Sequence, residues 1–413
     1  MNTLYWLPAD PHWRARLRAL SALTDRAWEE AVALASCQID FVLTNALDQV
    51  IGRVVPPRPA GVIGPSIRLA VLGSATLTHL LPAIRVGGVR RGMWLETYEN
   101  EYGQYLQELS DPDSGFHRFK PTAVLIALDA QHLAAGITAG LEETDAEALF
   151  EEVTARIRET WRVARQAFRG PIMQQTALPL HLPTLGGNEH RLPGSRARFI
   201  TRLNQALRAM ADQEGVDLLA IDDRVAQDGL AAWHDPALWH RSKQEIAPPA
   251  APLYGDLVAR QLAAGLGRSA KCLVLDLDNT VWGGVVGDDG VEGIVVGQGS
   301  PLGEAYAAFQ DYCRELSRRG VILAVCSKND EVNALEPFDK HPDMVLQRSD
   351  ISCFVANWSD KAANIRTIAQ ELNIGLDSLV FVDDNPFERN LIRRELPMVA
   401  VPEVTDEPAF YAQ

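Results

Sequence analysis

Two pairs of aspartates follow apolar segments in the last third of the 413-residue chain. Asp276 and Asp278 end the segment CLVLDLD, while Asp383 and Asp384 end the segment LVFVDD. Because side chains alternate along a strand, we expect Asp276 and Asp278 to point the same way. Carboxylates this close repel each other unless a cation or a shared proton relieves them. Mg²⁺ is the cation that suits a site made only of oxygen ligands.

A hydroxyl group and an ammonium group complete this candidate site. Ser327 ends the apolar segment ILAVCS, and Lys361 stands in the first turn of the helix predicted for WSDKAANI. Phosphoryl transfer needs a carboxylate nucleophile, a metal ion and donors for the phosphoryl oxygens. A single acid in such a position is more often a helix cap or a solvated group, but the four segments together favour phosphoryl chemistry.

An open parallel sheet is the element that would bring these residues together. Strands and helices alternate over residues 266–413, which predicts a doubly wound sheet whose ligands bind beyond the carboxyl ends of its strands. The predicted strands are 272–278, 321–327, 379–384 and 399–401, and the predicted helices are 303–319, 360–372, 386–394 and one that follows Asp330.

Two further parts precede this domain. Residues 1–60 are predicted to be helical, since Trp28, Val32, Ala35 and Ile39 form one apolar stripe, and the segment VVPPRPAGVIGP then forms a linker. Residues 61–265 are predicted to be a second α/β domain. Its predicted strands are 67–72, 123–128, 171–176 and 216–221, with a long helix in 141–168 and a surface loop over 179–193.

Composition narrows the class of protein. The chain is 47% hydrophobic, which is typical of a folded globular protein, and its formal net charge of -15 opposes binding to a nucleic-acid backbone. The five cysteines include no C-x-x-C pair, so we expect free thiols in a reducing cytoplasm rather than a zinc site. No apolar segment reaches the length that spans a membrane.

In chain order, the segments that carry Asp276 and Asp278, Ser327, Lys361, and Asp383 and Asp384 resemble the four motifs of the haloacid dehalogenase (HAD) superfamily. The resemblance implies that Asp276 attacks phosphorus and that Asp278 acts as general acid and base. It also implies that Ser327 hydrogen-bonds the phosphoryl group and that Lys361 neutralises the charge of the nucleophile and the phosphate.

The same resemblance implies a Mg²⁺ site. Asp383 is expected to hold the ion together with Asp276 and the backbone carbonyl of Asp278, and Asp384 is a weaker candidate for the outer shell. There is no large insertion between the first two motifs: before the helix predicted for 303–319 stands only WGGVVGDDGVEGIVVGQGS, enough for a hairpin flap. The expected fold is therefore a Rossmann-like domain without a cap, and an open site suits a large or macromolecular substrate.

Four longer segments resemble the FkbH-like family within HAD subfamily IIIC: VLDLDNTVWGGVVGDDG, CSKND, ANWSDKAANI and VFVDDNPFERN. Such proteins are glyceryl transferase/phosphatases. They take the glyceryl unit of 1,3-bisphosphoglycerate, a small phosphorylated three-carbon substrate, and remove its phosphate. They load the acyl group onto a phosphopantetheinylated acyl carrier protein for polyketide-type biosynthesis. Family members often continue into an acetyltransferase-like domain, so a chain ending at residue 413 is expected to be a short variant or a truncated form.

The domain of residues 61–265 is similar to SGNH hydrolases, with a flavodoxin-like α/β fold. Ser74 follows the first strand as the nucleophile of such hydrolases does, but its LGSAT context lacks the acid that usually precedes the serine. Asp235 and His240 lie five residues apart rather than three. We therefore expect a degenerate fold used for binding, in which His79 and His240 are ordinary polar residues.

Acyl transfer in this family proceeds through an enzyme thiol. Cys326 adjoins Ser327 at a strand end and is the first candidate, while Cys353 lies in the predicted loop before Lys361 and is the second. Cys272 is expected in the core. For docking of a carrier, the Arg90–Arg91 and Arg393–Arg394 pairs are candidate patches.

Two rival functions stay open beside the acyl-loading enzyme. One is a simple Mg²⁺-dependent phosphatase that acts on a small metabolite without a thioester step. The other is a partner-binding module with a vestigial HAD domain, which the complete set of motifs disfavours.

Overall fold

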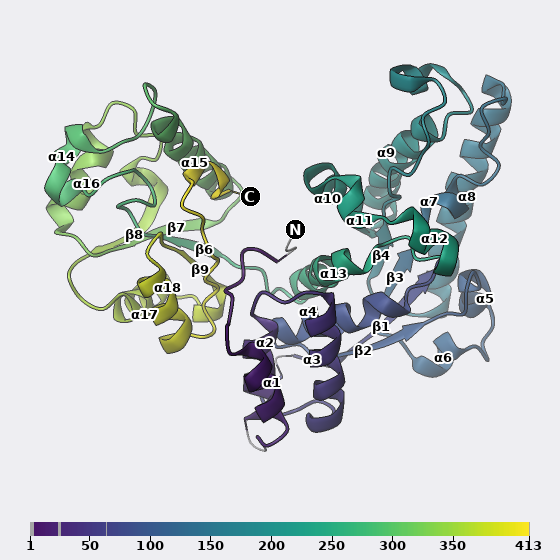
Figure 1. Cartoon of the computed structure of the whole chain (residues 1–413), viewed down its shortest axis with the longest axis horizontal. Helices are drawn as coiled ribbons and strands as arrows, with labels where there is room; N and C mark the ends of the chain where they lie inside the picture. The colour runs from purple at the N-terminus through teal and green to yellow at the C-terminus, as the bar shows by residue number, and fades with distance from the viewer. Residues whose placement is uncertain (1–3, 24–25, 63, 413) are drawn as a thin grey trace. The chain divides into compact units, whose positions relative to one another are not determined.

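The computed structural model describes residues 4–23, 26–62 and 64–412, and the chain divides into two compact units. Unit 1 comprises Ala9–Leu266, and unit 2 comprises Gly267–Gln413 together with Tyr5–Pro8. The helices of residues 13–54 belong to the same unit as the first sheet, because α2 (Ala27–Ala35) and α3 (Phe41–Val54) pack against α4 (Leu81–Arg90). Figure 1 labels the helices and strands of both units.

Unit 2 is built on a parallel sheet in the order β8-β7-β6-β9. Its strands are β6 (Cys272–Leu275), β7 (Ile322–Ser327), β8 (Ile351–Ala356) and β9 (Leu379–Val382). Its helices are α14 (Val286–Gly293), α15 (Pro301–Arg318), α16 (Glu331–Lys340), α17 (Lys361–Glu371) and α18 (Pro386–Glu395).

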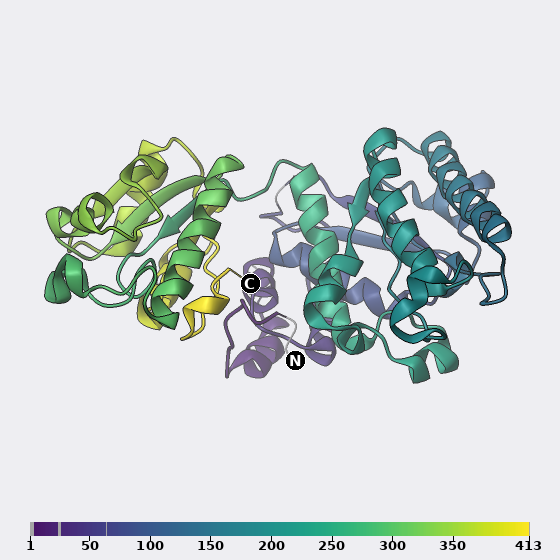
Figure 2. The same cartoon turned by 90° about the horizontal axis from the view of Figure 1, so that it is seen from above.

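Apolar side chains cover both faces of this sheet, as alternation along buried strands requires. Leu275 and Val325 face α15 and α16 in one apolar cluster, whereas Val274 and Cys326 face α17 and α18 in the other. Figure 2 shows helices on both sides of these strands. The doubly wound α/β fold predicted for this part of the chain is confirmed.

Between β6 and β7 the described residues form a short flap followed by α15. Gly283 and Val295 exchange two backbone hydrogen bonds of 3.0 and 2.8 Å, and α14 occupies the excursion between them. Among the described residues, the connection between β6 and β7 is therefore a flap and a helix rather than a cap domain.

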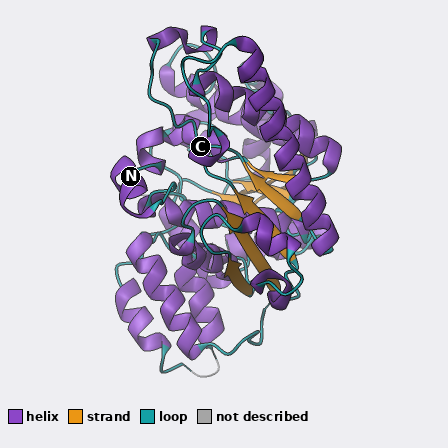
Figure 3. Ribbon diagram, turned by 90° about the vertical axis from the view of Figure 1, so that its right-hand side faces the viewer, coloured by secondary structure: helices purple, strands orange, loops and turns teal. Residues whose placement is uncertain are grey.

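Unit 1 contains a second parallel sheet in the order β2-β1-β3-β4-β5, which is the flavodoxin-like order. Figure 3 shows its strands, in orange, flanked by helices. The strands are β1 (Ile67–Gly73), β2 (Leu95–Glu99), β3 (Ala123–Ala127), β4 (Ile172–Gln175) and β5 (Asp217–Leu219). The helices are α1 (Trp13–Leu20), α2 (Ala27–Ala35), α3 (Phe41–Val54), α4 (Leu81–Arg90), α5 (Tyr105–Ser110), α6 (Gly115–Phe119), α7 (Ala130–Leu133), α8 (Glu143–Ala167), α9 (Arg196–Glu214), α10 (Ile221–Asp228), α11 (Leu230–Trp233), α12 (Pro236–Ser242) and α13 (Ala251–Gly265).

Several sequence predictions of local structure were wrong. The stripe from Trp28 to Ile39 is not one helix, because α2 ends at Ala35 and Ile39 is buried in the following loop. Strands β2 and β8 were not predicted from the sequence, and Cys353 lies in β8 rather than in the predicted loop. The predicted strand 399–401 is reduced to a single parallel bridge between Val380 and Ala400.

Candidate active site

Three aspartates converge where β6 and β9 end side by side. These strands pair in parallel with Leu275 opposite Val382, and the backbone N–H of Asp276 donates to the carbonyl of Val382 at 2.9 Å. Asp276, Asp383 and Asp384 each offer a carboxylate oxygen to a group whose members lie within 4.8 Å of one another. The first two side chains are buried, and Asp384 is partly exposed.

Lys361 is the cation that holds this group together in the described structure. It opens α17, whose first turn is capped by the Asp360 carboxylate accepting from the N–H of Ala362. Its Nζ lies 2.8 Å from Asp276 Oδ1 and 2.6 Å from Asp383 Oδ2. Since the lysine side chain is only 3% exposed, this ammonium is committed to the two carboxylates.

The electrostatics of the cluster follow from burial and mutual repulsion. Burial raises the pKa of Asp383 to about 6, and the Asp276 carboxylate adds to this rise while Lys361 opposes it. Burial likewise raises the pKa of Asp276, against the lowering influence of Lys361. Burial lowers the pKa of Lys361, but the two carboxylates raise it more, so its net pKa lies above the usual value. The cluster thus has an excess of negative charge that a further cation would relieve.

The donor set fits a magnesium ion. Three carboxylates close enough to share one ion, with no sulfur or imidazole among the described members of the group, are what a hard divalent cation prefers. Asp384, which we expected only as a weaker candidate in the outer shell, offers an oxygen within the same 4.8 Å limit as the other two aspartates. The side chain of Asp278 is not a member of this group.

Asp278 instead faces the flap and the loop that follows β7. Its Oδ1 accepts from Trp282 Nε1 and from the backbone N–H of Val286, both at 3.0 Å, and its Oδ2 accepts from Asn329 Nδ2 at 3.1 Å. The expectation that Asp276 and Asp278 point the same way was based on a strand through residue 278. The strand ends at Leu275, so simple alternation does not apply beyond it.

Ser327 is placed at the carboxyl end of β7, which is the neighbour of β6. Its side chain is buried, and its backbone carbonyl accepts from the N–H of Asn357 at 3.2 Å. The serine therefore ends the strand adjacent to the one that carries Asp276.

Two residues that hold the loop after β9 in place were not predicted from the sequence. Arg389 of α18 donates to the backbone carbonyls of Asp383 and Asp384 at 2.8 and 2.6 Å and pairs with Glu403 at 2.7 Å. Thr280 Oγ1 accepts from the backbone N–H of Asp384 at 3.0 Å. Both fix the loop after β9, and the only sequence signal for them was their place inside the quoted motifs.

The cysteines do not open onto this cluster. Cys326 is fully buried on the α17 side of the sheet, opposite to the face of Ser327, and burial raises the pKa of its thiol to about 12. Cys353 is also buried, donates to Glu371 Oε2 at 3.0 Å, and has a pKa raised to about 12, first by burial. Cys272 lies in the same apolar cluster, as expected. Protonated thiols in the core are poor nucleophiles, so this conformation does not support our assignment of Cys326 or Cys353 as the acyl carrier.

The candidate residues Ser74, Asp235 and His240 of unit 1 do not form a hydrolase triad in the described structure. Ser74 Oγ donates to Asp129 Oδ2 at 2.5 Å and accepts from the N–H of Asp129 at 2.9 Å. Asp235 caps α12 by accepting from the N–H of Ala237, and His240 is exposed in the last turn of that helix. His79 contacts the carbonyl of Ile246 at 2.7 Å.

A buried glutamate, missed in the sequence analysis, lies beside this serine and aspartate. Glu245 Oε1 accepts from the N–H of Ala130 at 2.6 Å. Burial, and then the neighbouring Asp129 carboxylate, raise the pKa of Glu245 well above its ordinary value.

Neither candidate docking patch is a free pair of cations. Arg90 and Arg91 both form ion pairs with buried Asp256, and Arg90 also donates to the carbonyl of Ala35. Arg393 pairs with Glu403 at 2.6 Å. Arg90, Arg91 and Arg393 are therefore held in ion pairs within their own units, whereas Arg394 is 73% exposed and pairs with the adjacent Glu395 at 3.0 Å.

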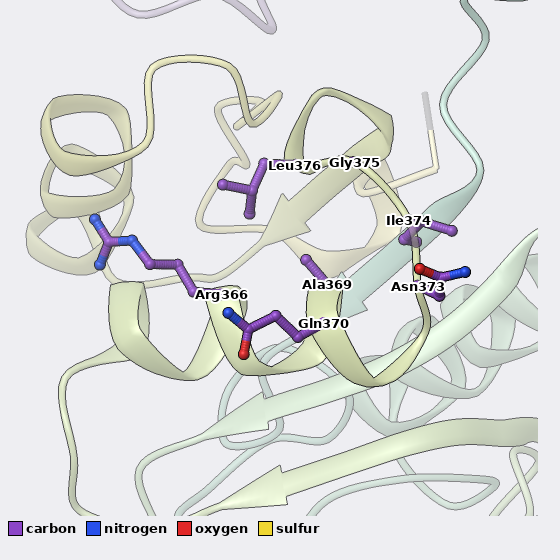
Figure 4. Close-up of a pocket in the computed structure, with 7 residues that line it drawn as sticks. All are labelled: Arg366, Ala369, Gln370, Asn373, Ile374, Gly375 and Leu376. Carbon is purple, nitrogen blue, oxygen red and sulfur yellow. The ribbon is translucent and has the colours of Figure 1, made fainter.

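A pocket of about 520 Å³ in unit 2 lies away from the aspartates. Figure 4 shows its lining on the last turns of α17 and the loop that leads to β9. The lining residues are Arg366, Ala369, Gln370, Asn373, Ile374, Gly375 and Leu376. Because Lys361 begins α17 and the pocket is at its other end, this pocket is not part of the candidate site.

The chain is similar to several known proteins. The family model described as FkbH, N-terminal domain, matches residues 68–255. A crystal structure of the N-terminal part of protein BF1531 from Bacteroides fragilis, described as containing a phosphatase domain and complexed with Mg, is 33% identical. That similarity covers 90% of this chain and 96% of that chain, with a TM-score of 0.81.

Other solved structures are more distant. A lipase/acylhydrolase from Enterococcus faecalis is 11% identical over 48% of this chain and 96% of that chain, with a TM-score of 0.33. An acetylxylan esterase variant from Geobacillus stearothermophilus is 10% identical over 50% and 96%, with a TM-score of 0.32. Both similarities are too low to support an inference. No curated protein sequence matches the chain. None of the described helices has both the length and the apolar composition that a bilayer crossing requires.

Proposed function

The chain belongs to the FkbH-like family of the haloacid dehalogenase superfamily, and on that basis we propose that it is a Mg²⁺-dependent phosphatase whose nucleophile is Asp276. The observation that carries the proposal is the buried ammonium of Lys361, which binds Asp276 and Asp383 beside a third carboxylate. A cluster of this kind is costly to bury, so a structural role alone does not account for it.

Each residue has a role that its position allows. Asp276 attacks phosphorus, and Lys361 neutralises the nucleophile before attack and the phosphoryl oxygens afterwards. Ser327, at the end of the adjacent strand, donates a hydrogen bond to the phosphoryl group. Asp383 and Asp384 would hold Mg²⁺ together with Asp276. When bound, this ion adds positive charge opposite the phosphoryl oxygens.

Asp278 completes the cycle as the proton-transfer group. It gives a proton to the leaving oxygen while the aspartyl phosphate forms, and it takes a proton from the water that later hydrolyses this phosphate. The net reaction converts a phosphorylated substrate and water into the free hydroxyl or carboxyl compound and phosphate.

We further propose that the substrate is an acyl phosphate of the 1,3-bisphosphoglycerate type. The thiol of an acyl carrier protein attacks the carbonyl carbon, the carbon–oxygen bond to the acyl phosphate breaks, inorganic phosphate and the thiol proton leave, and a thioester to the carrier forms. Asp276 attacks the phosphorus of the remaining phosphate ester, and hydrolysis of the aspartyl phosphate leaves the glyceryl unit on the carrier. Support for transfer to a partner comes from the flap, which leaves the strand ends without a cap domain. The buried state of Cys326 and Cys353 favours a carrier that supplies the attacking thiol itself. Hydrolysis of a small phosphorylated metabolite without a thioester step is the second candidate.

The test is an incubation of the protein with Mg²⁺, 1,3-bisphosphoglycerate and a phosphopantetheinylated carrier protein. Mass spectrometry of the carrier and a phosphate assay are the readouts. A glyceryl adduct on the carrier with phosphate release supports the full proposal, and phosphate release alone supports the simple phosphatase. An adduct that requires Cys326 or Cys353, shown by its loss in the Cys326→Ala, Cys353→Ala double variant, would restore the enzyme-thiol route.

A further inference from the structure

The two oxygens of the Asp278 carboxylate accept different numbers of hydrogen bonds from the described residues. Its Oδ1 accepts two hydrogen bonds, from Trp282 Nε1 and from the N–H of Val286, whereas its Oδ2 accepts one, from Asn329 Nδ2. Each carboxylate oxygen has two lone-pair positions for hydrogen bonds. Oδ1 is therefore saturated, and Oδ2 keeps one position in which a proton can be carried.

Asn329 is fixed in the orientation that this contact needs. It is 3% exposed, and its Oδ1 accepts from the N–H of Asp330 at 3.0 Å. Because the oxygen of the amide is used by this backbone N–H, the Nδ2 group is the one that faces Asp278. The amide thus donates to Oδ2, and no second hydrogen bond to that oxygen is found among the described residues.

The contact also joins two parts of the site. Trp282 and Val286 follow Asp278 closely in the chain and belong to the flap segment, whereas Asn329 is 51 residues away, in the loop after β7. That loop begins at Ser327, the residue expected to bind the phosphoryl group. A bond from Asn329 to Asp278 therefore fixes the proton donor relative to the phosphoryl group.

We propose that Asn329 is a positioning residue that presents the Oδ2 atom of Asp278 for proton transfer to the leaving oxygen. This inference rests on the proposed function, since it takes Asp278 as the general acid. In the step concerned, Asp276 forms a bond to phosphorus and the bond from phosphorus to the leaving oxygen breaks. The proton on Asp278 Oδ2 passes to that oxygen.

The experiment compares two substrates that share the phosphoryl group and differ in the leaving group. Phenyl phosphate needs a proton on its leaving oxygen, while 4-nitrophenyl phosphate needs little help because the nitro group delocalises the charge. The measured quantity is kcat/KM, which includes the formation of the aspartyl phosphate but not its hydrolysis. General acid catalysis typically contributes about 10²–10⁴-fold, and we expect Asn329→Ala to lose about 10–100-fold with phenyl phosphate and less than about 3-fold with 4-nitrophenyl phosphate.

Further variants separate positioning from folding. Asn329→Asp keeps the side-chain size and the acceptor for the N–H of Asp330, and it should show the same substrate-dependent loss. Asn364→Ala breaks the amide pair between Asn364 of α17 and Asn357 of the loop before that helix, and it should affect both substrates equally. In the Asp278→Asn background, Asn329→Ala should cause no further loss, because the residue acts through Asp278.

Equal losses with both substrates in Asn329→Ala and Asn329→Asp would overturn the positioning role, as would additive losses with Asp278→Asn. These outcomes leave the proposed function intact. That proposal fails on a different result, namely phosphate release from either substrate that survives in Asp276→Asn.

Discussion

Replacing Lys361 with methionine probes the charge balance of the carboxylate cluster. Methionine keeps most of the side-chain length but removes the ammonium that lies 2.8 Å from Asp276 Oδ1 and 2.6 Å from Asp383 Oδ2. Removing one partner of a buried ion pair typically costs about 3–5 kcal/mol. The loss of stability cannot exceed the free energy needed to protonate one of the two carboxylates, because protonation removes its unpaired charge. Placing a proton on one aspartate of ordinary pKa about 3.9 at pH 7 costs about 4 kcal/mol, at about 1.4 kcal/mol per pH unit.

We therefore expect metal-free Lys361→Met to lose about 3–4 kcal/mol of the stability of unit 2 at pH 7. The assay is hydrogen exchange in EDTA and increasing urea, followed on peptides from β6 and β9 so that unit 2 is measured separately from unit 1. Mg²⁺ should stabilise the variant more than the wild type, because it replaces the missing positive charge.

Lys340→Met is the matched control. Lys340 is on the surface of α16, 62% exposed, and pairs with Glu336 at 2.9 Å. The loss of such an exposed pair should change stability by less than about 1 kcal/mol. If Lys361→Met were as stable as Lys340→Met in EDTA, Lys361 would not be balancing buried charge, and our account of the cluster would be refuted.

Two predictions concern unit 1. Ser74→Ala should leave phosphate release unchanged, because Ser74 is hydrogen-bonded to Asp129 and not to an imidazole. Labelling of Ser74 by a fluorophosphonate probe would show instead that this serine is an activated nucleophile. Glu245→Gln should stabilise unit 1 at pH 8. Burial raises the pKa of Glu245, so the wild type loses stability as pH rises from the ordinary glutamate range towards the raised pKa, and a neutral amide lacks this loss. Thermal unfolding of both proteins across pH measures the difference, and parallel pH profiles would contradict it.

The sequence was most informative where a local pattern carries the signal. Asp276 and Asp383 were identified because acids directly after buried apolar strands are conspicuous, and the parallel pairing of β6 and β9 brings them together. The strands that the sequence analysis missed, β2 and β8, are both at sheet edges. Both are only partly buried, so they lack the continuous apolar character by which even the edge strand β9 was recognised.

Contacts between distant parts of the chain could not be predicted in this way. The bond from Asn329 to Asp278 spans 51 residues, and its geometry depends on where the strand ends. For Cys326, in contrast, a local pattern was enough to predict the position of the side chain. Its neighbour Ser327 ends the strand beside the site, and alternation along the strand alone places the two side chains on opposite faces. Proximity in sequence to a functional residue was a poor guide to the position of the thiol.

The most direct test of the central claim is to trap the phosphorylated enzyme. Wild-type protein and Asp276→Asn are mixed with Mg²⁺ and an acyl phosphate, quenched in acid and analysed by peptide mass spectrometry alongside a phosphate assay. Our account predicts a phosphate adduct on Asp276 in the wild type, with both the adduct and phosphate release reduced to background in Asp276→Asn. Phosphate release that persists in Asp276→Asn, or an adduct that maps to another residue, would contradict it.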